Sequence, residues 1–144
     1  MKCVVINGAN GERIEIAING YERDANGDFH DSNWVYSIIT FSLGEIRGCV
    51  HATMLTYEFV EFKKNVQDLY RSLVGQAKFE TMEGQLEITL TGNGRGGIAV
   101  NGIITEKPGH GIKVIFELAI DQTYLPDIIS GLSEINSKYS VRQA

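Results

Sequence analysis

The sequence predicts an α+β fold, in which a mostly antiparallel sheet of about eight strands packs with two amphipathic helices. Two observations carry this prediction. Strand-like alternation fills residues 1–55 and returns over residues 76–120. A helical pattern closes each stretch, over about Tyr57–Val74 and Tyr124–Lys138. Runs of strands that each end in a helix are typical of this class. The pattern leaves open whether the sheet is open, curved or closed like a barrel.

In the first half, alternation of apolar and polar side chains defines the strands. Arg13–Asn19 carries three isoleucines on one face and polar residues on the other, which is typical of a half-buried strand. Trp34–Leu43 is apolar on both faces, so we expect a central strand that is covered on both sides, with Trp34, Ile38 and Phe41 buried. Six Asn-Gly pairs indicate turns, because both residues tolerate positive φ. The other strands expected here are Lys2–Ile6 and Glu45–Leu55.

The two helices carry their own start and stop signals. Thr56 is a plausible N-cap of the first helix, and Gly75 follows its end. Pro126 falls in the first turn of the second helix, where its missing N–H costs little. Apolar residues recur every three or four positions, so we expect one face of each helix to pack on the sheet through Phe62, Val66, Leu69, Ile128 and Leu132. The strands expected between the helices are Gln76–Met82, Gln85–Thr91, Ile98–Thr105 and Gly111–Ile120.

Length and composition predict one domain over residues 1–144. A chain of 144 residues can bury a sufficient core by itself, and two prolines leave no room for a stiff linker. The formal net charge of −5 argues against nonspecific nucleic-acid binding, which requires basic side chains. The chain shows no apolar run typical of a signal peptide or a membrane span. Cys3 and Cys49 lie in strand patterns, where we expect buried, inert thiols. We therefore expect a cytoplasmic protein.

An acidic cluster stands out between the second and third expected strands. Glu22, Asp24, Asp28 and Asp31 surround a single basic residue, Arg23. The cluster fits an ordinary solvated loop, because connecting segments are polar and lie on the surface. It also fits a contact surface for a basic protein partner. Asp28–Asp31 includes His30, but the spacing matches no zinc or calcium motif, so we expect no metal site.

The remaining candidates for chemistry are weak. Gly92–Gly97 is rich in glycine but joins two strands, whereas a phosphate-binding loop feeds a helix. Cys49 and His51 share one face of a strand, yet nothing marks an orienting carboxylate or an oxyanion hole. Glu58 and Glu61 lie one turn apart near a helix N-terminus, where carboxylates complement the helix dipole. We therefore expect no enzyme, no catalytic residue and no cofactor.

Several segments together resemble the WapI-type bacterial immunity proteins over roughly residues 30–136. The resemblance implies a cytoplasmic, non-enzymatic protein that binds and neutralises a contact-dependent toxin domain with nuclease activity. It supplies no catalytic residue. A basic toxin domain would be the partner, facing the acidic residues Glu22, Asp24, Asp28 and Asp31. The segments that carry the resemblance are Asp31–Val35, Tyr57–Phe62, Leu69–Gly75, Glu83–Ile88 and Asp121–Pro126.

A second interpretation comes from a different functional class. The sheet and helices could enclose an apolar pocket for a small molecule, with aromatic walls and a few polar groups inside. Its walls would be Trp34, Tyr36, Phe41 and Phe116. The same side chains are equally explained as core filling, which is the usual role of aromatic residues in strands.

Overall fold

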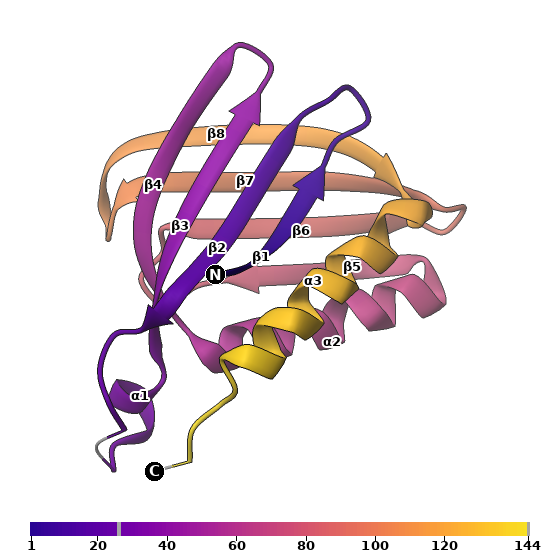
Figure 1. Cartoon of the computed structure of the whole chain (residues 1–144). Coiled ribbons are helices and arrows are strands. Elements are labelled where there is room, and N and C mark those ends of the chain that lie inside the picture. Colours follow the sequence, from indigo (N-terminus) through magenta and orange to yellow (C-terminus); the bar gives the residue numbers. More distant parts are fainter. Residues whose placement is uncertain (26, 144) are drawn as a thin grey trace.

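The computed structural model describes residues 1–25 and 27–143, and within them eight strands form two four-stranded antiparallel sheets (Figure 1). The predicted α+β class and the order of strands and helices are confirmed. The strands divide between two sheets rather than one, and neither sheet closes into a barrel. The first sheet contains β1 (Lys2–Asn7), β2 (Arg13–Tyr21), β3 (Trp34–Leu43) and β4 (Ile46–Leu55). The second contains β5 (Val74–Glu80), β6 (Leu86–Asn93), β7 (Gly97–Lys107) and β8 (His110–Asp121).

Helix α2 (Thr56–Ser72) follows the first sheet, and α3 (Leu125–Lys138) follows the second after a 3₁₀ turn, η1 (Gln122–Tyr124). A short helix that the sequence analysis did not predict, α1 (Phe29–Ser32), lies between β2 and β3. Leu55 is the N-cap of α2, so the assignment of Thr56 as N-cap is wrong. Thr56 is instead the first helical residue, and its hydroxyl donates to Asn33 Oδ1. No helix of the described residues is long and apolar enough to cross a membrane.

The end of α2 also differs from the expectation. Leu73 is the C-cap and takes the left-handed conformation at φ 62°, so the C′ residue is Val74 and the prediction of Gly75 at that position is wrong. Gly75 lies inside β5. The Leu73 carbonyl accepts from the Gly94 N–H at 2.8 Å, which fixes the chain as it enters the second sheet. A Cβ at Gly92 would lie 2.4 Å from this carbonyl oxygen, so glycine is required there.

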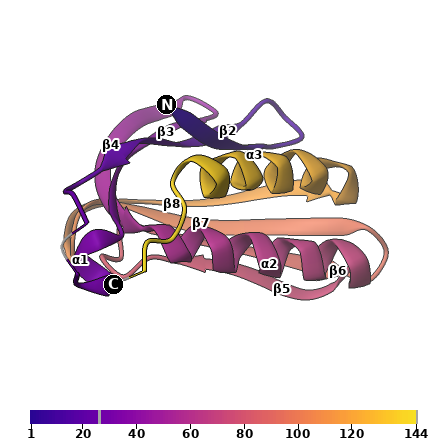
Figure 2. The same ribbon diagram turned by 60° about the horizontal axis from the view of Figure 1, so that its bottom comes forward.

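Each of the two long helices packs against the sheet formed by the other half of the chain. Helix α2 follows the first sheet but packs against β5 of the second, and α3 follows the second sheet but packs against β1 of the first (Figure 2). Gly131 of α3 permits this approach, because a Cβ there would lie 3.0 Å from Val4 Cα. The two helices also contact each other. Neither half therefore buries its apolar face alone.

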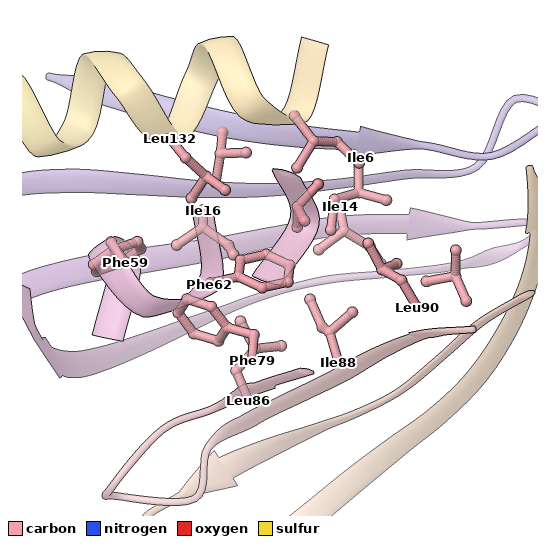
Figure 3. Packing of buried hydrophobic residues seen from close by; sticks show 14 of the residues in the cluster. Ile6, Ile14, Ile16, Phe59, Phe62, Phe79, Leu86, Ile88, Leu90 and Leu132 are labelled. Carbon is pink, nitrogen blue, oxygen red and sulfur yellow. The ribbon is translucent and has the colours of Figure 1, made fainter. Parts of the chain in front are cut away.

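The core lies between the inner faces of the two sheets and is completed by the helices (Figure 3). Phe59 and Phe62 of α2 meet Phe79 of β5 edge to face, with ring centroids 5.3 and 4.8 Å apart. Phe41 is buried as predicted, and so are all the helix residues expected to pack on the sheet, namely Phe62, Val66, Leu69, Ile128 and Leu132.

The prediction that β3 is covered on both faces is wrong. Val35 and Ile39 point into the core and are fully buried, whereas Trp34 and Ile38 are only half-buried. Tyr36, between them, is 50% exposed. The physical reason is the placement of the helices, which both lie on the inner side of the first sheet. Its outer face has no covering element among the described residues.

The Asn-Gly pairs divide between turns and strands. The pair at residues 10–11 lies between β1 and β2, and the pair at 93–94 starts at the last residue of β6 and enters the turn to β7, with the glycine φ at 86° and 83°. The pairs at 19–20 and 101–102 lie inside β2 and β7, contrary to the turn prediction. Gly20 is at a register shift of β2, and Gly102 lies beneath the ring of Phe116. The pair at 26–27 includes Asn26, which lies outside the described residues.

Candidate partner-binding surface

The four predicted partner-binding carboxylates lie in one connection, residues 22–32, which we call the acidic loop. Arg23 organises part of it, because its guanidinium contacts Glu22 at 2.7 Å and Asp31 at 3.7 Å. The hydrogen bond with Glu22 is the main cause that raises the pKa of Arg23. Asp24 is exposed and forms no ion pair with any residue that the structure describes. The structure thus groups Glu22 and Asp31 and leaves Asp24 open to a partner.

Asp28 has a local structural role. Its carboxylate accepts from the Asp31 N–H at 3.0 Å, and its carbonyl accepts from the Ser32 N–H at 2.9 Å. These bonds cap the single turn of α1, which by itself is too short to be stable. Asp28 remains exposed, whereas Asp31 and Glu22 are half-buried. The described residues of the loop, 22–25 and 27–32, therefore present carboxylates at the surface.

Asn33 anchors the end of the acidic loop, and it is fully buried. Its Nδ2 donates to the carbonyls of Phe29 at 2.6 Å and Arg142 at 2.9 Å. Its Oδ1 accepts from the Thr56 hydroxyl and from the Arg142 N–H, both at 2.7 Å. These four bonds use the full capacity of the amide. Asn33 thereby ties the loop to the start of α2 and to the C-terminal segment.

Arg142 provides the second anchor from the far end of the chain. Its Nη1 donates to the Arg23 carbonyl at 2.9 Å, and its guanidinium lies 3.4 Å from the centroid of the Tyr21 ring. This stacking is a cation–π contact. The Tyr21 hydroxyl donates to the Ser140 carbonyl at 2.6 Å, which holds the same segment. Sequence reasoning missed Arg142, since no motif or periodicity marks it.

Aromatic contacts join α1 to the first turn of α2. The Phe29 ring stacks on Tyr57 with centroids 5.3 Å apart and planes 10° apart. His30 Nδ1 lies 3.0 Å from the Tyr57 hydroxyl. His30 is thus engaged in packing. The described residues contain no group of three or more potential metal-binding side chains, and Asp28–Asp31 forms none.

Glu58 and Glu61 do not form an acid–base pair. Glu58 Oε1 accepts from the Leu55 N–H and Oε2 from the Met82 N–H, each at 2.7 Å. Burial raises the pKa of Glu58, and these two hydrogen bonds oppose the rise. Glu61 is exposed and lines, with Glu58, a groove of about 490 Å³ between α2 and β5. Glu58 therefore caps α2 and ties it to the turn before β6.

The other candidate sites do not gather into catalytic arrangements. Cys49 and His51 lie on one face of β4, and both are exposed. The prediction that Cys49 is buried is wrong, because this face of the first sheet is uncovered. No hydrogen bond joins the two side chains within the described residues. The glycine-rich run at 92–97 is the β6–β7 hairpin, in which Asn93 Oδ1 accepts from the Arg95 and Gly97 N–H groups.

The four aromatic residues proposed as pocket walls lie in different places. Trp34 and Tyr36 lie on the outer face of the first sheet. Phe41 and Phe116 lie in the core, where each ring covers a glycine of the neighbouring strand, at positions 48 and 102. Tyr36 lines one surface pocket and Phe116 another. The four side chains therefore do not enclose one cavity for a small molecule.

Comparison with protein families places this geometry in context. The model of the immunity protein WapI-like family matches residues 5–140. The chain belongs to this family. The match begins within β1, well before the first segment that suggested the resemblance, so it takes in the whole acidic loop. Comparison with curated proteins gives no significant match.

The segments that carry the WapI-like resemblance include the anchors described above. Asp31–Val35 contains Asn33, and Tyr57–Phe62 contains Glu58. Asp121–Pro126 contains the η1 turn, whose cap is Asp121; its Oδ1 accepts from the Thr123 N–H at 2.8 Å. Hydrogen bonds from Thr123 lower the pKa of Asp121. In this family member, these segments fix the acidic loop, the start of α2 and the start of α3.

Proposed function

We propose that this WapI-like protein binds and neutralises a toxin domain with a basic contact surface, and that it does so without catalysis. The observation that carries the proposal is the acidic loop, which is exposed yet anchored by Asn33 and Arg142. Because these contacts hold both ends of the loop before binding, less conformational entropy is lost when a partner docks. Membership of the immunity family supplies the kind of partner.

The charge of the surface favours a basic partner. The loop carries four carboxylates, of which Glu22 and Asp31 contact Arg23, while the Arg142 guanidinium donates to the Arg23 carbonyl, so the surface keeps a negative charge. The whole chain carries a formal net charge of −5. A nuclease is basic where it holds phosphate, and an inhibitor gains from acidic groups placed there. We therefore propose a nuclease domain as the toxin and the cytoplasm as the place of its neutralisation.

The test compares wild-type protein with the variant E22Q/D24N/D28N/D31N. Asparagine is as good an N-cap as aspartate, so D28N should preserve α1. Binding kinetics are measured by surface plasmon resonance with the purified toxin domain encoded beside this gene, at two ionic strengths. Because rim charges act mainly on association, we expect a lower on-rate with weaker salt dependence and little change in the off-rate.

A matched control changes the net charge equally at exposed carboxylates outside the loop. It should keep most of the wild-type on-rate, since local charge steers docking more than distant charge does. An on-rate that is unchanged in the loop variant would remove the loop from the interface. Absence of binding by the wild-type protein, or failure to protect cells that express the toxin domain, would refute the proposed function. The control substitutions are E45Q, E87Q, E117Q and E134Q.

A further inference from the structure

Along β3, the outer face of the first sheet carries an apolar row where a solvated sheet would be polar. Successive outward positions of β3 carry Trp34, Tyr36 and Ile38, since Val35 and Ser37 between them are buried on the opposite face. An antiparallel sheet with one face in water usually places polar side chains there. Here a tyrosine that is 50% exposed lies at the middle of a half-buried aromatic and aliphatic row.

Charged side chains are confined to the far end of this face. Arg13 and Glu15 pair at 2.8 Å near the β1–β2 hairpin, and Arg47 lies near the β3–β4 turn. On the strands around Tyr36 the face carries His51 and uncharged polar residues such as Asn19 and Thr53, and it is hollowed by a depression of about 340 Å³ that Tyr36 and Ile38 help to line. Interface centres are depleted in charge and enriched in aromatic residues, which matches this composition.

The apolar face borders the acidic loop directly. Trp34 follows the loop anchor Asn33 in the chain, and its carbonyl accepts from the Glu22 N–H at 2.9 Å. The pKa of Arg23 is raised first by its hydrogen bond with Glu22 and more weakly by Tyr36, whose hydroxyl is therefore near the loop. Figure 1 shows the loop and α1 at the end of the sheet where β2 ends and β3 begins. The two surfaces form one continuous area.

We propose that the outer face of the first sheet, centred on Tyr36, is the apolar centre of the toxin contact, and that the acidic loop is its charged rim. This inference rests on the proposed function. The occupant is a basic protein domain with an exposed apolar patch beside its lysine and arginine residues. A second copy of this chain fits less well, because each copy has a net charge of −5 and an acidic loop at the border of the face.

The two parts of the surface have different kinetic roles. Rim charges accelerate association, whereas side chains at a desolvated centre slow dissociation. Tyrosine is enriched among residues whose truncation weakens binding most. We therefore expect Y36A to weaken binding by about 30-fold or more, mainly through a faster off-rate, while the on-rate and its salt dependence persist. The acidic-loop variant should show the opposite pattern.

The test uses full-length protein and the purified toxin domain encoded beside this gene. Kinetics are compared for the wild-type protein, Y36A and the control Y70A. Tyr70 is 44% exposed on α2, close to the 50% of Tyr36, and lies away from the first sheet. We expect Y70A to bind as the wild-type protein does. Thermal melting confirms that each variant is folded.

A second measurement needs no variant. Cys49 is exposed on the same face, and its neighbour His51 pairs in register with Ile38. Iodoacetamide labelling of Cys49, followed by peptide mass spectrometry, should proceed in the free wild-type protein and be lost in its complex with the toxin domain.

The outcomes separate this inference from the proposed function. Wild-type binding with equal off-rates for Y36A and Y70A, or with Cys49 still labelled in the complex, would overturn the docking face and leave the immunity function standing. No binding by the wild-type protein would overturn both. Analytical ultracentrifugation tests whether a second copy of this chain occupies the face instead. If the wild-type protein is a dimer in which Cys49 is protected, and Y36A is a monomer, the face is a dimer interface and not the toxin contact.

Discussion

The two sheets have the same plan and different outer faces. Each is a four-stranded antiparallel meander followed by a helix, and each turns an apolar inner face to the shared core. The outer face of the first sheet carries Trp34, Tyr36 and Ile38 along β3, and its charged residues Arg13, Glu15 and Arg47 lie toward the hairpins. The outer face of the second carries exposed charged residues on several strands, namely Lys78, Glu80, Glu87, Lys113 and Glu117. Because both faces meet the same solvent, folding alone does not explain the difference. It is explained if only the first sheet serves as a contact surface.

Exposed apolar residues of the second sheet mark the limit of this contrast, since Val74 on β5 is 64% exposed and Ile112 on β8 is 71% exposed. Ile115 on β8 is 75% exposed and pairs in register with Ile103. It lies among charged neighbours, two residues from Lys113 and from Glu117. Single exposed apolar residues are common on protein surfaces and require no partner. The first sheet differs because its apolar side chains follow one another along a central strand and continue into the acidic loop.

The largest expected effect tests whether the two halves are one cooperative unit. Leu69 of α2 is 3% exposed and belongs to the cluster that joins both sheets. L69A should lower the free energy of unfolding by about 2–5 kcal/mol, the range for a truncated core leucine. Trp34, the single tryptophan, reports on the first sheet. In urea, its fluorescence and the far-UV circular dichroism should shift together to lower denaturant.

Y70A serves as the control for L69A, since Tyr70 is the next residue and is partly exposed. We expect little change in its unfolding midpoint. A Trp34 transition that stays at the wild-type urea concentration while the circular dichroism transition moves would show that the halves unfold separately. That outcome would contradict the view that the packing of α2 on β5 and of α3 on β1 makes the two halves unfold together.

Much of the fold could be predicted because its signals are local. Alternation in β2 and the three-to-four spacing in α2 each decide which side chains face inward, and Ile16 and Leu69 are buried as that logic requires. Division into two sheets could not be predicted, since alternation does not show which strands pair. The prediction that β3 is covered on both faces is wrong for a related reason. An apolar second face shows that a strand can be covered, but the sequence does not show whether another helix or strand lies over Tyr36.

The site divides in the same way. The placement of the four acidic residues in one connection between two strands could be predicted, because charge in a connecting segment is a local property of the sequence. Asn33 and Arg142 could not be recognised as anchors, because their contact joins residues that are 109 positions apart. Cys49 was placed on the correct face of its strand but with the wrong burial, since periodicity gives a face and not its neighbours.

The next prediction compares a feature that both sheets share. Phe41 covers Gly48 in the first sheet, and Phe116 covers Gly102 in the second. A Cβ would lie 2.5 Å from Phe41 Cζ at Gly48 and 2.2 Å from Phe116 Cζ at Gly102. G102A should cost about 1–3 kcal/mol of stability, the range for overpacking a core.

G48A should cost less, because Gly48 is half-buried near the β3–β4 turn, where the Phe41 ring can move outward. Gly102 is buried and has β6 and β8 on its two sides. Urea unfolding of both variants measures the difference. An equal or larger loss in G48A would show that the two aromatic covers are equally confined.

A smaller effect is expected at Glu58, which ties the end of the first sheet to the second half. Glutamine has one acceptor oxygen where Glu58 uses two, so E58Q should cost roughly 1–2 kcal/mol at neutral pH. Because burial raises the pKa of Glu58, the folded protein holds this proton more tightly than the unfolded chain does. The stabilisation that comes from holding this proton on Glu58 is therefore fully present below the pKa of the unfolded chain, and it is lost as the pH rises through the pKa of the folded protein.

Unfolding free energies measured across this pH range give the sign. The stability of the wild-type protein minus that of E58Q should decrease as the pH rises. E61Q is the control, one turn away at an exposed carboxylate, and we expect its difference from the wild-type protein to vary less with pH. A wild-type advantage that grows with pH would mean that the two backbone hydrogen bonds outweigh burial at Glu58.

The smallest effect concerns reactivity and leaves stability unchanged. Cys49 is exposed on β4, whereas Cys3 on β1 is half-buried, and both lie on the outer face of the first sheet. If that face is open in solution, a thiol reagent should label Cys49 faster than Cys3, since access limits the reaction of an ordinary thiol. Labelling rates of C3S and C49S, each with one remaining cysteine, measure the two sites separately. If Cys49 is labelled slowly in the free protein and faster in mild denaturant, another molecule already covers this face. The apolar residues on the first sheet would then belong to an existing contact rather than to an open surface.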